Sequence, residues 1–127
     1  MSELPLRLVY LANVVVAGQI GISALFTPGR AAQTVFQGAV AESEGLRVVG
    51  ALWLAIAVLS ACGLLAPKPF SAVLALQLVY KGSWLLVAAL PAIRSGAPYP
   101  TGMAGFFAAW VLVLPWVIPW RWLFAVD

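Results

Sequence analysis

The segment Ala66-Pro67-Lys68-Pro69 decides how this chain folds, because it separates two long apolar runs. The run before it covers about residues 46–66, and the run after it covers about residues 70–92. Proline does not continue a helix through its interior, and lysine is costly inside a bilayer. The segment therefore predicts a tight hairpin between two membrane-spanning helices that are antiparallel neighbours.

Two further apolar runs flank this hairpin, at about residues 6–26 and 102–120. Each is close to the 20 residues that a membrane-spanning helix needs. Ser43 and Thr101 are expected N-caps of the second and fourth spans, and Pro115 is expected to kink the fourth. The prediction is an all-α protein: an antiparallel four-helix transmembrane bundle in which residues 1–127 form a single integral membrane domain.

The connection after the first span is the longest in the chain. Within it, residues 28–40 place five apolar residues at helical spacing: Ala32, Val35, Phe36, Ala39 and Val40. This pattern fits a short helix that lies in the membrane interface. An ordered loop is the other interpretation, since the stretch contains Gly38 and little charge.

Composition supports the membrane assignment and excludes several chemistries. Of the 127 residues, 64% are apolar and 9% are charged, against about 45–50% and 25% in soluble domains. The net charge of +3 comes from scattered Lys and Arg, typical of membrane boundaries, so no nucleic-acid partner is expected. The chain has no histidine and one cysteine, Cys62, which excludes a haem histidine and a thiol pair. We expect no metal site and no cofactor held by this chain alone.

Orientation is not decided by the charges, since three basic residues flank the spans on each side. We lean to cytoplasmic termini, because the first loop carries Glu42 and Glu44 while the C-terminal end carries Arg121 among aromatic residues. That aromatic group is typical of a belt at the membrane interface, and it contains Trp116, Trp120, Trp122 and Phe124. A partner-binding aromatic patch is the other interpretation.

Lys81 is the most informative residue. It lies about eleven residues after Phe70, roughly 16 Å into a hydrocarbon core about 30 Å thick. A lysine at that depth costs roughly 2.5–3.5 kcal/mol on insertion scales and usually faces the bundle interior. Gln77, Lys81 and Trp84 share one helix face, with Tyr80 beside it. We name these four residues the Lys81 stripe and expect it to face the first or second span.

The partner of the Lys81 ammonium is left open by the sequence. Asn13 and Gln19 of the first span are the natural neutral partners, but six residues separate them by about 240° around a helix, so both cannot point at Lys81. A loop that dips back would bring Glu42 or Glu44 instead. Three roles of Lys81 are left open. It binds an anionic or carbonyl-bearing ligand, it has a structural role in which amides and carbonyls accept its hydrogen bonds, or its side chain extends to the membrane surface (snorkelling).

Three segments carry a resemblance to a known family: LRVVGALW at residues 46–53, GLLAP at 63–67 and QLVYKGSWL at 77–85. They resemble the small four-helix bacterial membrane proteins of the DoxX-like kind. The resemblance implies a location in the bacterial inner membrane and an association with quinone-linked oxidoreductases, in which other chains would hold the redox centre.

Three functions are compatible with these residues. The first is a non-enzymatic bundle or accessory subunit that binds a lipid, a quinone, a partner subunit or a second copy of the chain through the Lys81 stripe. A small transporter is the second, although such proteins usually carry a membrane-embedded carboxylate. The third is a membrane enzyme that uses Lys81 as base or electrophile.

Overall fold

The computed structural model describes residues 3–125, and within that range it contains helices and loops but no strands. The helices are α1 (Leu4–Phe26), α2 (Pro28–Thr34), α3 (Glu44–Leu65), α4 (Ala72–Trp84), the π-helix η1 (Leu85–Ala89), α5 (Leu90–Ser95), α6 (Thr101–Val117) and α7 (Trp120–Leu123). The all-α prediction is confirmed for the described part of the chain.

Three helical stretches are long and apolar enough to cross a membrane: α1, α3 and the continuous stretch Ala72–Ser95, which comprises α4, η1 and α5. Large apolar side chains are exposed on the outside of all three, among them Val15, Leu52 and Val79. Exposed apolar surface on long apolar helices is what a bilayer covers. The chain has the build of a small membrane protein.

Helix α6 is shorter than the predicted fourth span. Its 17 residues give a length of roughly 26 Å, because each residue of an α-helix adds 1.5 Å. Pro115 lies inside it, and the helix ends at Val117; the next helix, α7, begins at Trp120.

The helices pack chiefly in two pairs, α1 with α3 and α4 with α6. The first pair meets through two glycines whose backbones lie against the partner helix. A Cβ on Gly50 would lie 2.5 Å from the backbone nitrogen of Leu25, and a Cβ on Gly21 would lie 2.7 Å from that of Leu54. Only a residue without a side chain permits this approach.

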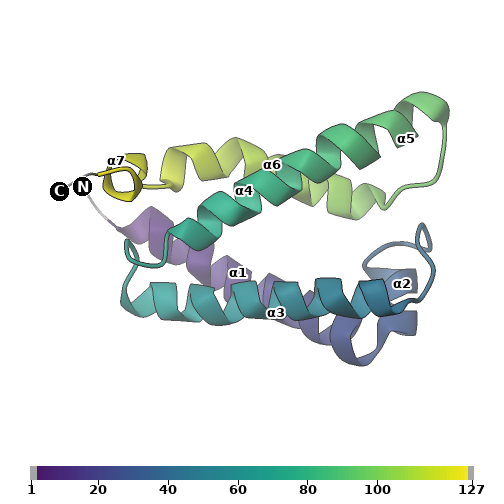
Figure 1. Ribbon diagram of the computed structural model, residues 1–127, viewed down its shortest axis with the longest axis horizontal. Helices are drawn as coiled ribbons and strands as arrows, with labels where there is room; N and C mark the ends of the chain where they lie inside the picture. Colours follow the sequence, from purple (N-terminus) through teal and green to yellow (C-terminus); the bar gives the residue numbers. More distant parts are fainter. Residues whose placement is uncertain (1–2, 126–127) are drawn as a thin grey trace.

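The hairpin between α3 and α4 is confirmed, but the two helices do not pack along their lengths. The Tyr10 hydroxyl of α1 donates to the Pro67 carbonyl at 2.6 Å, and the Ser71 hydroxyl donates to the Lys68 carbonyl at 2.7 Å. Beyond this turn the pairs α1–α3 and α4–α6 separate toward the far end of the molecule (Figure 1).

The two ends of the molecule carry the basic residues that the sequence assigns to them. The start of α1, the α3–α4 turn and α7 lie at one end, and α2 and the α5–α6 connection lie at the other (Figure 1). The first end has Arg7, Lys68 and Arg121. Arg30, Arg47 and Arg94 belong to the second, so the structure keeps the predicted division of three against three.

The first loop is partly helical, and it caps a distant helix. Helix α2 covers about half of residues 28–40 and is followed by two residues with positive φ, Gln37 and Gly38. The Gln37 side-chain oxygen accepts from the Gly102 backbone nitrogen at 2.7 Å and from the Thr101 hydroxyl at 3.2 Å. The prediction of Thr101 as N-cap was wrong, because Pro100 precedes α6 and Gln37 satisfies its first turn. Ser43 caps α3 as predicted, accepting from the Leu46 nitrogen at 3.2 Å.

Helix η1 was not predicted. Pro91 has no backbone N–H, and in an α-helix its ring clashes with the carbonyl four residues earlier. The chain widens just before this proline: the Leu90 nitrogen donates to the Leu85 carbonyl, five residues back. This wider bonding lets one continuous helix run past the proline.

Candidate functional site

Three buried polar side chains from three helices meet inside the molecule. Asn13 of α1 donates through Nδ2 to the Gln77 Oε1 atom of α4 at 2.7 Å, and Gln77 Nε2 donates back to Asn13 Oδ1 at 3.1 Å. The same Nδ2 lies 3.2 Å from the Ser60 Oγ atom of α3. Reciprocal bonding satisfies both amides in a place where water does not reach them. This cluster links the pair α1–α3 to the pair α4–α6.

Lys81 lies one turn further along α4 and is buried, with 4% of its surface exposed. Its Nζ donates to the Tyr80 hydroxyl at 2.9 Å. The ammonium also lies 4.1 Å from the centre of the Phe107 ring and 4.7 Å from the centre of the Tyr80 ring. Such short distances to ring faces indicate cation–π contacts, which strengthen away from water.

Burial contradicts the snorkelling interpretation, and the direction of the side chain differs from the prediction. Lys81 contacts Phe107 of α6, whereas we expected it to face the first or second span. The neutral partners proposed from the sequence are not its partners either. Asn13 pairs with Gln77, and Gln19 is exposed on the other side of α1.

The carboxylates of the first loop also stay away from Lys81. Glu44 pairs with Arg47 at 3.3 Å on the exposed start of α3. Glu42 is exposed beside Gly29. Among the described residues, therefore, Lys81 has a hydroxyl and two aromatic rings around it and no carboxylate within 4 Å. Residues 3–125 also contain no group of His, Cys, Asp and Glu that could hold a metal ion.

Tyr80 joins the two parts of this polar interior. Besides accepting from Lys81, its hydroxyl interacts with the side chains of Trp53 and Gln77. Trp84, the last member of the Lys81 stripe, packs edge-on against Phe107 with ring centres 5.4 Å apart. The structure thus brings together Gln77, Tyr80, Lys81 and Asn13, with Trp84 adjacent through Phe107.

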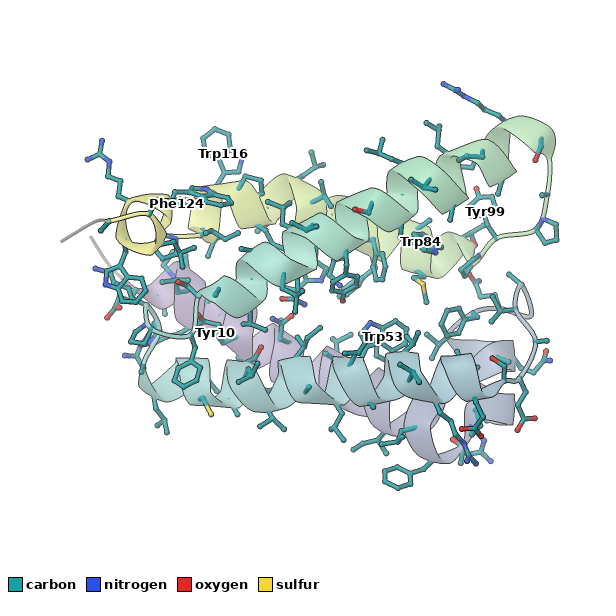
Figure 2. All side chains as sticks on the ribbon, viewed as in Figure 1. Tyr10, Trp53, Trp84, Tyr99, Trp116 and Phe124 are labelled. Atoms are coloured by element: carbon teal, nitrogen blue, oxygen red, sulfur yellow. The ribbon has the colours of Figure 1, made fainter. Side chains whose placement is uncertain are left out.

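An apolar cleft of about 340 Å³ borders this polar interior. Its aromatic lining comes from Trp53 of α3, Tyr80 and Trp84 of α4, Phe107 of α6 and Phe36 of the first loop. Figure 2 shows Trp53 and Trp84 pointing into the space between α3 and the pair α4–α6. We name this space the aromatic cleft.

The mouth of the aromatic cleft is formed by exposed leucines, Leu52 and Leu59 of α3 and Leu76 of α4. Leu52 is 60% exposed, whereas Trp53 and Phe107 at the inner wall are buried. Both α3 and the stretch Ala72–Ser95 are long and apolar enough to cross a membrane, so the cleft opens between two candidate spans.

Three residues of this site were missed from the sequence: Ser60, Trp53 and Phe107. Ser60 and Trp53 lie within an apolar run, where a single serine or tryptophan is ordinary. Phe107 comes from a span that the sequence does not pair with the third. The sequence does place Trp53 seven residues before Ser60, a spacing that puts both residues on one face of a helix.

Comparison with protein-family models, curated proteins and solved structures found no match for this chain. The DoxX-like resemblance of residues 46–85 stays a prediction.

Proposed function

We propose that this chain is a small multi-pass membrane protein that binds a hydrophobic ligand, a lipid or a quinone, in the aromatic cleft beside Lys81. The observation that carries the proposal is the cleft itself. It is apolar, it borders a buried polar cluster, and its mouth lies between two membrane-spanning helices. Ligand sites typically combine an apolar lining with a few placed polar groups.

The size of the cleft limits what fits. Ligand pockets measure about 300–1,000 Å³, so a volume of about 340 Å³ lies at the small end of the range. A ring or one acyl chain suits that volume better than a whole two-chain lipid. Entry from the bilayer needs no water-filled path, because Leu52, Leu59 and Leu76 offer an apolar mouth.

We also propose that α6 is a fourth span and that the long helices form an antiparallel four-helix bundle. Its 17 residues are at the lower limit of about 17–25 for a span. Apolar side chains of α6 are exposed, including Leu112 and Trp116, and Figure 2 shows Trp116 pointing away from the other helices. Four crossings would place both termini on one side of the membrane.

A role as accessory subunit is the form of this proposal that the DoxX-like resemblance favours. In that role the chain would offer the cleft to a quinone while partner chains of the bacterial inner membrane hold the redox centre. No specific observation within residues 3–125 favours the transporter or the enzyme alternative.

A blocking substitution in the cleft tests the proposal. Ala55 lines the mouth, whereas Ala51, one turn earlier on α3, is exposed outside it. In nanodiscs, a diazirine-bearing quinone analogue should label the peptides that contain Trp53 and Tyr80. Ala55→Trp should reduce this labelling, and the matched Ala51→Trp should not.

Circular dichroism of both variants checks that they remain folded. Labelling confined to outward-facing positions such as Leu86 and Val87, or labelling that Ala55→Trp leaves unchanged, would contradict binding in the cleft.

A further inference from the structure

The hydroxyl of Tyr80 accepts a hydrogen bond from a buried lysine. A phenol has one O–H donor and an oxygen that accepts. Here the oxygen accepts from Lys81 Nζ at 2.9 Å. Because an ammonium has no acceptor, the hydroxyl hydrogen points to an acceptor other than Lys81. Tyr80 itself lines the aromatic cleft.

The positive charge of Lys81 lies directly behind this hydroxyl. The ammonium has three donors, of which one is used on Tyr80. Its remaining surface faces the Phe107 and Tyr80 rings, both of which line the cleft. A hydroxyl that accepts from a cation becomes a stronger donor, because neighbouring hydrogen bonds polarise one another. Tyr80, which lines the cleft, thus carries a hydroxyl donor whose oxygen is bonded to a cation.

We infer that the aromatic cleft takes a single-chain amphiphile with an anionic head, a long-chain carboxylate, whose oxygen accepts from the Tyr80 hydroxyl. This inference rests on the proposed function and names the ligand class of the same site. Tyr80 makes the direct contact, and Lys81 is a positioning residue that acts through Tyr80. The acyl chain lies along Trp53 and Trp84 and leaves between Leu52 and Leu76.

Charge and volume favour a carboxylate over the other occupants. The groups around the Tyr80 oxygen carry one positive charge, and no carboxylate of the described residues lies within 4 Å of Lys81. A buried cation is costly until an anion accompanies it, so a carboxylate gains more here than a quinone carbonyl or an alcohol. The small volume admits one chain, which excludes a phospholipid with two.

The test compares an acid with its uncharged analogue. Tritiated palmitic acid and tritiated palmityl alcohol are titrated onto the full chain in phosphatidylcholine nanodiscs, with bound label read by scintillation proximity. The acid should bind roughly ten- to hundred-fold tighter than the alcohol, the range expected for a charge-assisted hydrogen bond.

Two variants locate the preference. Tyr80→Phe and Lys81→Met should each reduce the acid affinity to about that of the alcohol, and the double variant should lose no more than either alone. The chain's other lysine, Lys68, lies exposed in the α3–α4 turn, and Lys68→Met should leave the ratio unchanged. Tyr80→Phe retains Lys81 and both aromatic rings beside it, so the test stands even where Lys81→Met does not fold.

The outcomes separate the two proposals. Equal affinity for acid and alcohol, both lost in Ala55→Trp, would overturn the anionic ligand while leaving a hydrophobic cleft site. Losses that add in the double variant would overturn the action of Lys81 through Tyr80. If neither amphiphile nor the short-chain quinone decylubiquinone competes for the cleft, the proposed function fails as well.

Discussion

Replacing Asn13 by alanine removes three hydrogen bonds that link α1 to α3 and α4. A hydrogen bond between membrane helices contributes about 0.6 kcal/mol on average, so three contribute about 2 kcal/mol. The Gln77 amide is then left buried without its partner, and an orphaned buried group costs about 1–3 kcal/mol. Because part of that cost is already counted in the lost bonds, we expect the free energy of unfolding to fall by about 2–4 kcal/mol.

Steric trapping in bicelles measures this change. The control is Gln19→Ala, which truncates an exposed amide on the same helix and should change stability by no more than about 0.5 kcal/mol. A double-mutant cycle with Gln77→Met should give a coupling of about 1–2 kcal/mol, since the two amides bond to each other. Additivity within about 0.5 kcal/mol would refute the reciprocal pair and with it the link between the two halves of the molecule.

Three further predictions concern packing, capping and topology. Gly50→Ala should lower the free energy of unfolding by about 1–3 kcal/mol, because the added Cβ meets the backbone of α1. The control is Gly105→Ala, whose Cβ meets nothing within 4 Å and which should be neutral or stabilising. Equal effects of the two variants would contradict the close approach of α1 and α3. Gln37→Ala should speed hydrogen exchange in the first turn of α6 while leaving α3 unchanged, and no change would show that the cap is dispensable. In a Cys62→Ala background, single cysteines at positions 3 and 125 should be labelled from one face and those at 42 and 96 from the other; positions 3 and 125 on opposite faces would remove α6 as a span.

The sequence predicts the elements of this fold well, because their limits are set by local chemistry. The prolines at positions 67 and 69 end one apolar run and begin the next, and Ser43 caps α3 through its own hydroxyl. The burial of Lys81 also follows from its position deep in an apolar run. Each of these features depends on residues that are neighbours along the chain.

The sequence could not predict which helices pack together, because the pairing depends on contacts between residues far apart in the chain. In the sequence, Gly50 is one of several small residues in an apolar run. Only the structure shows that it lies against the backbone of Leu25. Asn13 and Gln77 both carry side-chain amides, and the residues around each of them do not indicate that the two amides bond to each other and not to Lys81. The capping of α6 by Gln37, 65 residues away, is of the same kind.

The π-helix η1 also determines which positions can be used to redesign the site. Eight residues separate Lys81 from Ala89, and in an uninterrupted α-helix they would be rotated about 80° apart. The wider turn removes part of that rotation, and Ala89 is 1% exposed, on the buried side like Lys81. Position 89 is therefore the place to engineer a second polar group in line with the lysine: Ala89→Ser adds a hydroxyl that can bond to its own helix, without reshaping the aromatic cleft.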